Sequence, residues 1–142
     1  MYKNDIELNQ RVRIIAGLSI ITIIALIHII GVRNYLKGDF YLIYCSYASD
    51  LIIPFGIYFL LCISELRYRI LKKWYVKASI IIGLTTLAEF LQLLGIYALG
   101  ITFDPIDIIV YVLGVGIAVI FDRLVFKQFI SSWDLEKMNR KT

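Results

Sequence analysis

The sequence of 142 residues contains only one histidine and two cysteines. With so few of these residues, the ligand spacings that are typical of zinc sites are absent. Cys45 and Cys62 fall near opposite ends of one apolar segment, so we expect no disulfide between them. Cysteine usage therefore indicates neither a metal site nor an oxidising compartment.

The sequence also lacks the short motifs that usually mark an active site. It has no Gly-rich phosphate loop, no HExxH metal-binding run and no nucleophile elbow. We therefore predict no catalytic residue, no cofactor and no metal from motifs. Whether the chain is an enzyme stays open, with a non-enzymatic role favoured.

Apolar residues dominate what is present. The composition is 60% hydrophobic, and the mean hydropathy is +0.79. A soluble domain of this size cannot bury so many apolar side chains, which predicts that lipid covers much of the surface. The net charge of +4 does not indicate a nucleic-acid partner, because the charges lie between the apolar runs.

Four apolar segments are long enough to cross a bilayer as helices, which takes about 20 residues each. They cover residues 14–32, 43–64, 75–99 and 105–126. Pro105 suits a helix start, and Pro54 should kink the second helix. The first segment is too long for a cleaved signal peptide and lacks a cleavage pattern, so we expect a retained helix. The prediction is an all-α membrane protein, one four-helix bundle over residues 1–142.

The basic residues orient this bundle. Of the 15 lysines and arginines, all but Arg33 and Lys37 lie in the N-terminal tail, the second connection or the C-terminal end. The positive-inside rule then places both termini in the cytoplasm. The polar, basic tail from residue 127 to 142 should be a solvated end near anionic headgroups.

Polar groups inside the spans are the candidate functional residues, because ionisable side chains are costly in a membrane. A helical rise of about 1.5 Å per residue places them all in the outer half of the bilayer, whereas the inner half has no comparable group. Glu89 and Gln92 share one helix face, as do Asp104 and Asp107. We predict a polar pocket that opens to the outside. The predicted ligand-binding residues are His28, Arg33, Asp50, Glu89, Gln92 and Asp107.

Several of these residues also have a purely structural interpretation. His28 can serve as an interhelical hydrogen-bond donor, and Asp50 can cap a helix or pair with Arg33. Asp104 precedes a proline and suits N-cap chemistry, and Asp107 lies where a helix dipole favours an acid. Glu89 lies too deep for a cap and is the strongest functional candidate.

The pattern Glu89-x-x-Gln92 followed by Asp107, Tyr111 and Gly114 resembles the VanZ-like superfamily of small bacterial membrane proteins. The resemblance covers about residues 40 to 123 and is closest to a branch classed as a domain of unknown function. Tyr111 stands where better-studied members have Asn. The resemblance implies an envelope-associated protein of the bacterial cytoplasmic membrane, and it does not imply an enzyme.

Four functions are compatible with these features. The favoured one is an envelope accessory or binding protein whose outer-leaflet pocket holds a lipid or a cell-wall-related amphiphile. The alternatives are a structural subunit of a larger membrane complex, a small proton-coupled transporter, and a membrane-embedded metal-dependent hydrolase that uses carboxylate and imidazole ligands. Expected partners are membrane lipids, a lipid-like ligand, and a membrane-protein partner or a second copy of the chain.

Overall fold

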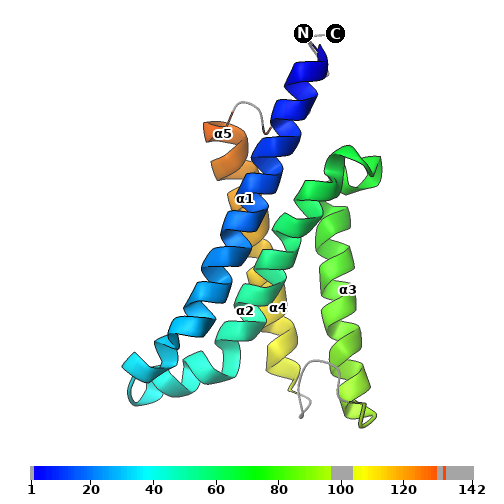
Figure 1. Cartoon of the computed structure of the whole chain (residues 1–142). Helices are drawn as coiled ribbons and strands as arrows, with labels where there is room; N and C mark the ends of the chain where they lie inside the picture. Colours follow the sequence, from blue (N-terminus) through cyan, green and yellow to red (C-terminus); the bar gives the residue numbers. More distant parts are fainter. Residues whose placement is uncertain (1, 97–103, 131–132, 134–142) are drawn as a thin grey trace.

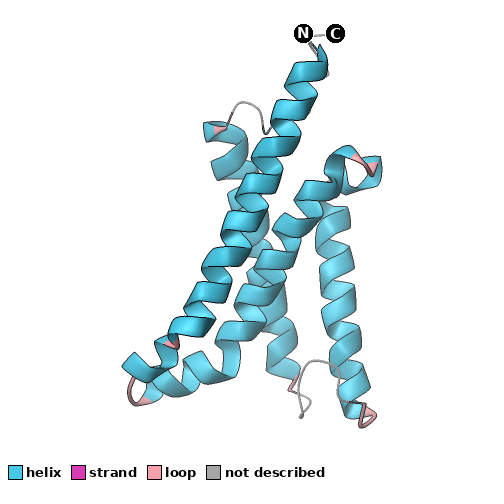
Figure 2. Cartoon of the chain, in the orientation of Figure 1, coloured by secondary structure: helices cyan, strands magenta, loops and turns pink. Residues whose placement is uncertain are grey.

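The computed structural model describes residues 2–96, 104–130 and 133. The described chain is helical and contains no strand (Figure 2). Its four long helices are α1 (Tyr2–Ile30), α2 (Asp39–Ile63), α3 (Trp74–Leu93) and α4 (Pro105–Ile120). Each is long and apolar enough to cross a membrane once the turns that extend α2 and α4 are included. The prediction of four apolar helices is confirmed.

Short helical elements connect and extend these four (Figure 1). The 3-10 turn η1 (Val32–Tyr35) joins α1 to α2, and η2 (Ser64–Leu66) and η3 (Arg69–Lys72) join α2 to α3. Helix α4 continues as a π-helical stretch, η4 (Phe121–Phe126), and ends in α5 (Lys127–Phe129). As a result, the start of α1, the α2–α3 connection and α5 lie at one end of the bundle.

Two helix ends differ from those predicted. Helix α1 begins at Tyr2, well before the apolar run, because Asn9 and Arg13 are buried against other helices. Helix α3 ends at Leu93, six residues short of its predicted end. There Gly95 has a φ of +79°, and the amides of Gly95 and Ile96 bond back to the carbonyls of Gln92 and Leu91 at 2.9 and 2.8 Å. This Schellman motif ends the helix; residues 97–99 lie outside the described part.

Helix α2 is the centre of the bundle and packs against α1, α3 and α4. Its first turns run at an angle to the rest (Figure 1). Pro54 lies within the helix and has no N–H to donate to the carbonyl of Asp50, one turn earlier. The bend therefore lies beside Asp50.

One glycine sets the distance between α2 and α4. A Cβ on Gly114 would lie 2.2 Å from the main-chain oxygen of Leu51, so only glycine fits there. Gly114 therefore permits close contact between the two helices. At Gly116 a Cβ would meet no atom within 4 Å, so Gly116 makes no such contact.

The outer surface of the four helices is apolar. Ile15, Leu42, Leu84 and Ile109, one from each span, are each more than 60% exposed. A surface of this kind is stable in lipid and is costly in water.

Candidate functional site

Three of the predicted carboxylates come together in the half of the bundle away from the start of α1. Asp50 of α2, Glu89 of α3 and Asp107 of α4 interact electrostatically with one another around the Tyr111 hydroxyl. We call Asp50, Glu89, Asp107 and Tyr111 the carboxylate cluster. Asp50 and Asp107 are half-buried, and Glu89 is only 1% exposed.

Helix geometry accounts for this convergence. Asp107, Tyr111 and Gly114 are spaced i, i+4 and i+7, so they share one face of α4. The close approach of Gly114 to Leu51 turns that face toward α2 beside Asp50. On α3, Glu89 shares a buried face with Thr85 and Gln92. Glu89 and Gln92 therefore share one face of α3, as predicted, and that face is the one packed against the rest of the bundle.

Glu89 is the most unusual member of the cluster. The Tyr111 hydroxyl donates a hydrogen bond of 2.7 Å to Glu89 Oε1. Glu89 Oε2 is buried and has no hydrogen-bond partner within the described structure. Buried carboxylate oxygens are nearly always hydrogen-bonded, so this oxygen requires an explanation.

The other predicted residues have simpler roles. His28 is exposed, with Nδ1 3.0 Å from the Ile24 carbonyl oxygen and Nε2 3.3 Å from Ser49 Oγ. The second contact joins α1 to α2, as the structural interpretation of His28 expects. Asp104 caps α4 by accepting from the Ile106 amide at 2.9 Å. Arg33 is exposed in η1 and forms no ion pair with any residue that the structure describes.

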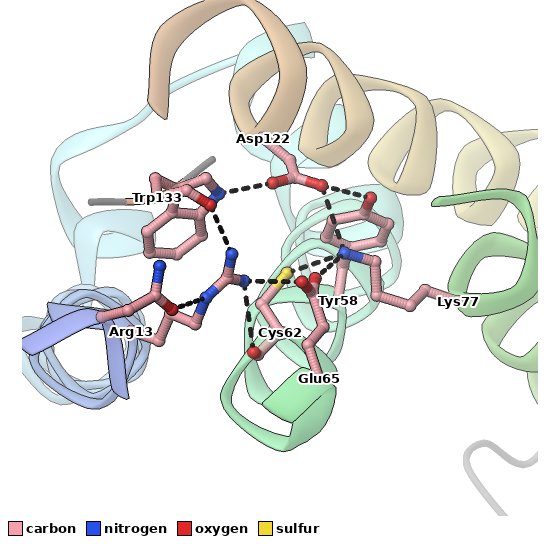
Figure 3. A network of polar contacts seen from close by, with 8 residues as sticks. Arg13, Tyr58, Cys62, Glu65, Lys77, Asp122 and Trp133 are labelled. Carbon is pink, nitrogen blue, oxygen red and sulfur yellow. Dashed lines mark hydrogen bonds and ion pairs between the residues drawn. The ribbon is translucent and has the colours of Figure 1, made fainter. Parts of the chain in front are cut away.

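A second polar assembly lies at the end of the bundle that holds the start of α1 (Figure 3). It contains two cations, two carboxylates and four further polar or aromatic groups, all buried. We call it the ion-pair network. Its members are Asn9, Arg13, Tyr58, Cys62, Glu65, Lys77, Asp122 and Trp133.

Arg13 joins three segments of the chain. Its guanidinium donates 2.7 Å hydrogen bonds to Asn9 Oδ1 and Glu65 Oε2. It also donates to the main-chain oxygens of Cys62 and Trp133, at 3.4 and 2.5 Å, and lies 4.5 Å from the centre of the Trp133 ring. Arg13 therefore holds the segment after α5 against α1 and the end of α2.

Lys77 also joins separate segments of the chain, on the other side of the network. Its Nζ donates to Cys62 Sγ and to Asp122 Oδ2, both at 3.1 Å, and forms an ion pair with Glu65. Asp122 also accepts from Tyr58 at 2.8 Å and from Trp133 Nε1 at 2.7 Å. Every charge has an opposite charge beside it, and the network is neutral overall.

The expectation that this half of the bundle has no polar group comparable to Glu89 is therefore wrong. From the sequence, Arg13 and Lys77 are counted among the flanking basic residues that set topology, whereas both side chains are buried. The solvated tail is also wrong at Trp133, which is 1% exposed. One signal was available, because Tyr58, Cys62 and Glu65 are spaced i, i+4 and i+7 on one helix face.

Three network residues have side-chain atoms close enough together to bind a metal ion. They are Cys62, Glu65 and Asp122, whose potential ligand atoms lie within 4.8 Å of one another. No other group of three in the described chain meets this criterion. The Lys77 ammonium, however, contacts all three residues. A metal ion would have to displace this cation, so the residues fit an internal ammonium group rather than a metal.

Neither a protein-family model, nor a curated protein, nor a solved structure matches this chain.

Proposed function

We propose that this chain is a membrane-embedded binding protein that holds the polar headgroup of an amphiphile in the carboxylate cluster. The observation that carries the proposal is the buried Glu89 Oε2, which has no partner within the described structure. Leaving such an atom unpaired costs about 1–3 kcal/mol, and more for a charged group. A molecule from outside the chain that donates to this oxygen would remove that cost.

The surroundings of the cluster favour an amphiphile over a water-soluble ligand. Ile106 and Ile109, on either side of Asp107, are 49% and 61% exposed. Phe90, next to Glu89, is 53% exposed. A molecule whose polar end reaches the carboxylates can therefore lay its apolar part along these side chains.

The proposal includes a location. The distribution of lysine and arginine supports an orientation with both termini in the cytoplasm, and the VanZ-like pattern supports the bacterial cytoplasmic membrane. The ion-pair network would then lie on the cytoplasmic side, and the carboxylate cluster would lie within reach of outer-leaflet lipids. An envelope-associated role of this kind is also what membership of the VanZ-like superfamily would imply, and we propose that membership on the Glu89, Gln92 and Asp107 pattern.

Lipid retention tests the proposed function. The full-length chain is purified from a bacterial membrane and examined by native mass spectrometry for co-purifying molecules. We expect the wild-type chain to retain an amphiphile that Glu89→Gln loses. The matched control is Asp39→Asn, which removes an exposed carboxylate at the start of α2 outside the cluster.

A second variant separates binding from folding. Asp107 is half-buried in the first turn of α4, so Asp107→Asn should fold and still weaken retention. Circular dichroism and gel filtration establish that each variant is folded. Equal retention by the wild type and by folded Glu89→Gln and Asp107→Asn would overturn the proposed function.

A further inference from the structure

We infer that the group bound by the carboxylate cluster is a protonated amine, an ammonium group that carries N–H donors. The inference rests on the proposed function and names the chemistry of the headgroup. Four independent features support it, namely the hydrogen-bond inventory, the local charge, a comparison within the chain, and the spacing of the carboxylates.

The cluster is short of donors. Ionised carboxylates only accept hydrogen bonds. Asp50, Glu89 and Asp107 bring acceptors from three helices, and the Tyr111 hydroxyl has one proton, which goes to Glu89 Oε1. A ligand for the Oε2 atom of an ionised Glu89 must therefore be a donor.

The cluster is also short of positive charge. No lysine, arginine or histidine forms an ion pair with Asp50, Glu89 or Asp107 among the described residues. Carboxylates that repel one another in a poorly hydrated site attract a cation. The ligand is therefore expected to be cationic as well as a donor.

The ion-pair network shows how this chain binds such a group. There the Lys77 ammonium lies between two carboxylates, Glu65 and Asp122, and donates to both (Figure 3). The carboxylate cluster has the same acceptors and lacks the lysine. An ammonium group from another molecule would take the position that Lys77 takes in the network.

The spacing of the carboxylates disfavours a metal ion. A divalent cation needs several oxygens at about 2.0–2.6 Å from one centre. In the described chain Asp50, Glu89 and Asp107 do not bring three ligand atoms within 4.8 Å of one another, in contrast to Cys62, Glu65 and Asp122. An ammonium group can bind with only two of these carboxylates, as the Lys77 ammonium does with Glu65 and Asp122.

A graded lipid series tests the inference. Phosphatidylethanolamine, its N-methyl and N,N-dimethyl forms, and phosphatidylcholine all carry a phosphate and a positive nitrogen. They differ in the number of N–H donors, and phosphatidylcholine has none. The full-length chain is placed in nanodiscs of phosphatidylcholine that contain one of the other lipids, and adducts are counted by native mass spectrometry after transfer to detergent.

We expect phosphatidylethanolamine to bind at least about tenfold more tightly than phosphatidylcholine, because hydrogen bonds to charged groups are the strong ones. The preference should be lost in Glu89→Gln and kept in Asp39→Asn. Butylammonium is a water-soluble ammonium ion without a lipid tail, and it is added in solution to compete with the bound lipid. If it displaces the lipid from the wild type but not from Glu89→Gln, the result supports the ammonium chemistry.

The failures of the two proposals are distinguishable. Lipid binding that depends on Glu89 but is equal for phosphatidylethanolamine and phosphatidylcholine overturns the ammonium inference and leaves the proposed function standing. Competition by Mg²⁺ alone, without competition by butylammonium, also overturns the inference. If no lipid binds in a Glu89-dependent way, and butylammonium has no Glu89-dependent effect, both proposals fail.

Discussion

Gly114 of α4 approaches the main-chain oxygen of Leu51 in α2 so closely that a Cβ on the glycine would lie 2.2 Å from it. The two helices touch backbone to backbone at this point. The neighbouring residue in α2 is Asp50, and Tyr111 precedes Gly114 by one turn of α4. The contact therefore sets both the packing of the bundle and the geometry of the carboxylate cluster.

Gly114→Ala should destabilise the protein, because the added Cβ would clash with the main chain of Leu51 and the helices must separate to relieve the clash. Overpacking of this kind costs about 1–3 kcal/mol. The matched control is Gly116→Ala, whose Cβ meets no atom within 4 Å. It should stabilise α4 by about 0.5–1 kcal/mol, because alanine is the better helix former. Thermal unfolding in detergent measures both, and equal behaviour of the two variants would contradict the packing described.

Lys77→Met should be strongly destabilising. It leaves Asp122 without the nearest cation and removes one of the two cations beside Glu65. Breaking a buried ion pair from one side costs about 3–5 kcal/mol. Lys72→Met removes an exposed lysine from η3 and should change the free energy of unfolding by less than about 0.5 kcal/mol. Chemical denaturation of the two variants separates a buried lysine from a flanking one.

Trp133→Ala tests whether the segment after α5 belongs to the folded bundle. The indole is 1% exposed, donates to Asp122, and packs against the tilted ring of Phe126 with ring centres 4.8 Å apart. Its loss should cost about 3–5 kcal/mol. Trp74 is 41% exposed, so Trp74→Ala is the control and should have a much smaller effect. If Trp133→Ala does not change the free energy of unfolding, the tail is solvated, as its composition predicts.

Tyr111→Phe removes the hydroxyl that donates to Glu89 Oε1 and leaves Glu89 with neither oxygen bonded within the described structure. We expect a loss of about 1–3 kcal/mol in the absence of ligand. The double variant Tyr111→Phe/Glu89→Leu should recover part of that loss, because replacing both partners by apolar groups removes the unpaired acceptor. Tyr41→Phe, at a 42% exposed tyrosine, provides the control. Unfolding measurements on the wild type, Tyr111→Phe, Glu89→Leu and the double variant give the coupling between Tyr111 and Glu89.

The sequence predicts the helices well because hydropathy over about 20 residues depends on residue type alone. It also predicts Asp50, Glu89 and Asp107 as one group, since helical rise converts position into depth. It does not predict where Arg13 or Lys77 points. A basic residue at the end of a span can reach the headgroups or turn inward to a carboxylate. Lys73 is exposed and Lys77, four residues later, is buried. Lys77 differs from Lys73 only because the packed structure places Glu65 and Asp122 beside it.

The composition of the ion-pair network bears on how the protein is made. Arg13 lies in α1 and Glu65 lies in η2, directly after α2, whereas Asp122 and Trp133 follow α4. A ribosome delivers the first pair long before the second. Until Asp122 arrives, Lys77 lacks half of its carboxylate partners, and Arg13 lacks the carbonyl of Trp133. The network therefore cannot be completed until the fourth helix and the residues that follow it have been made.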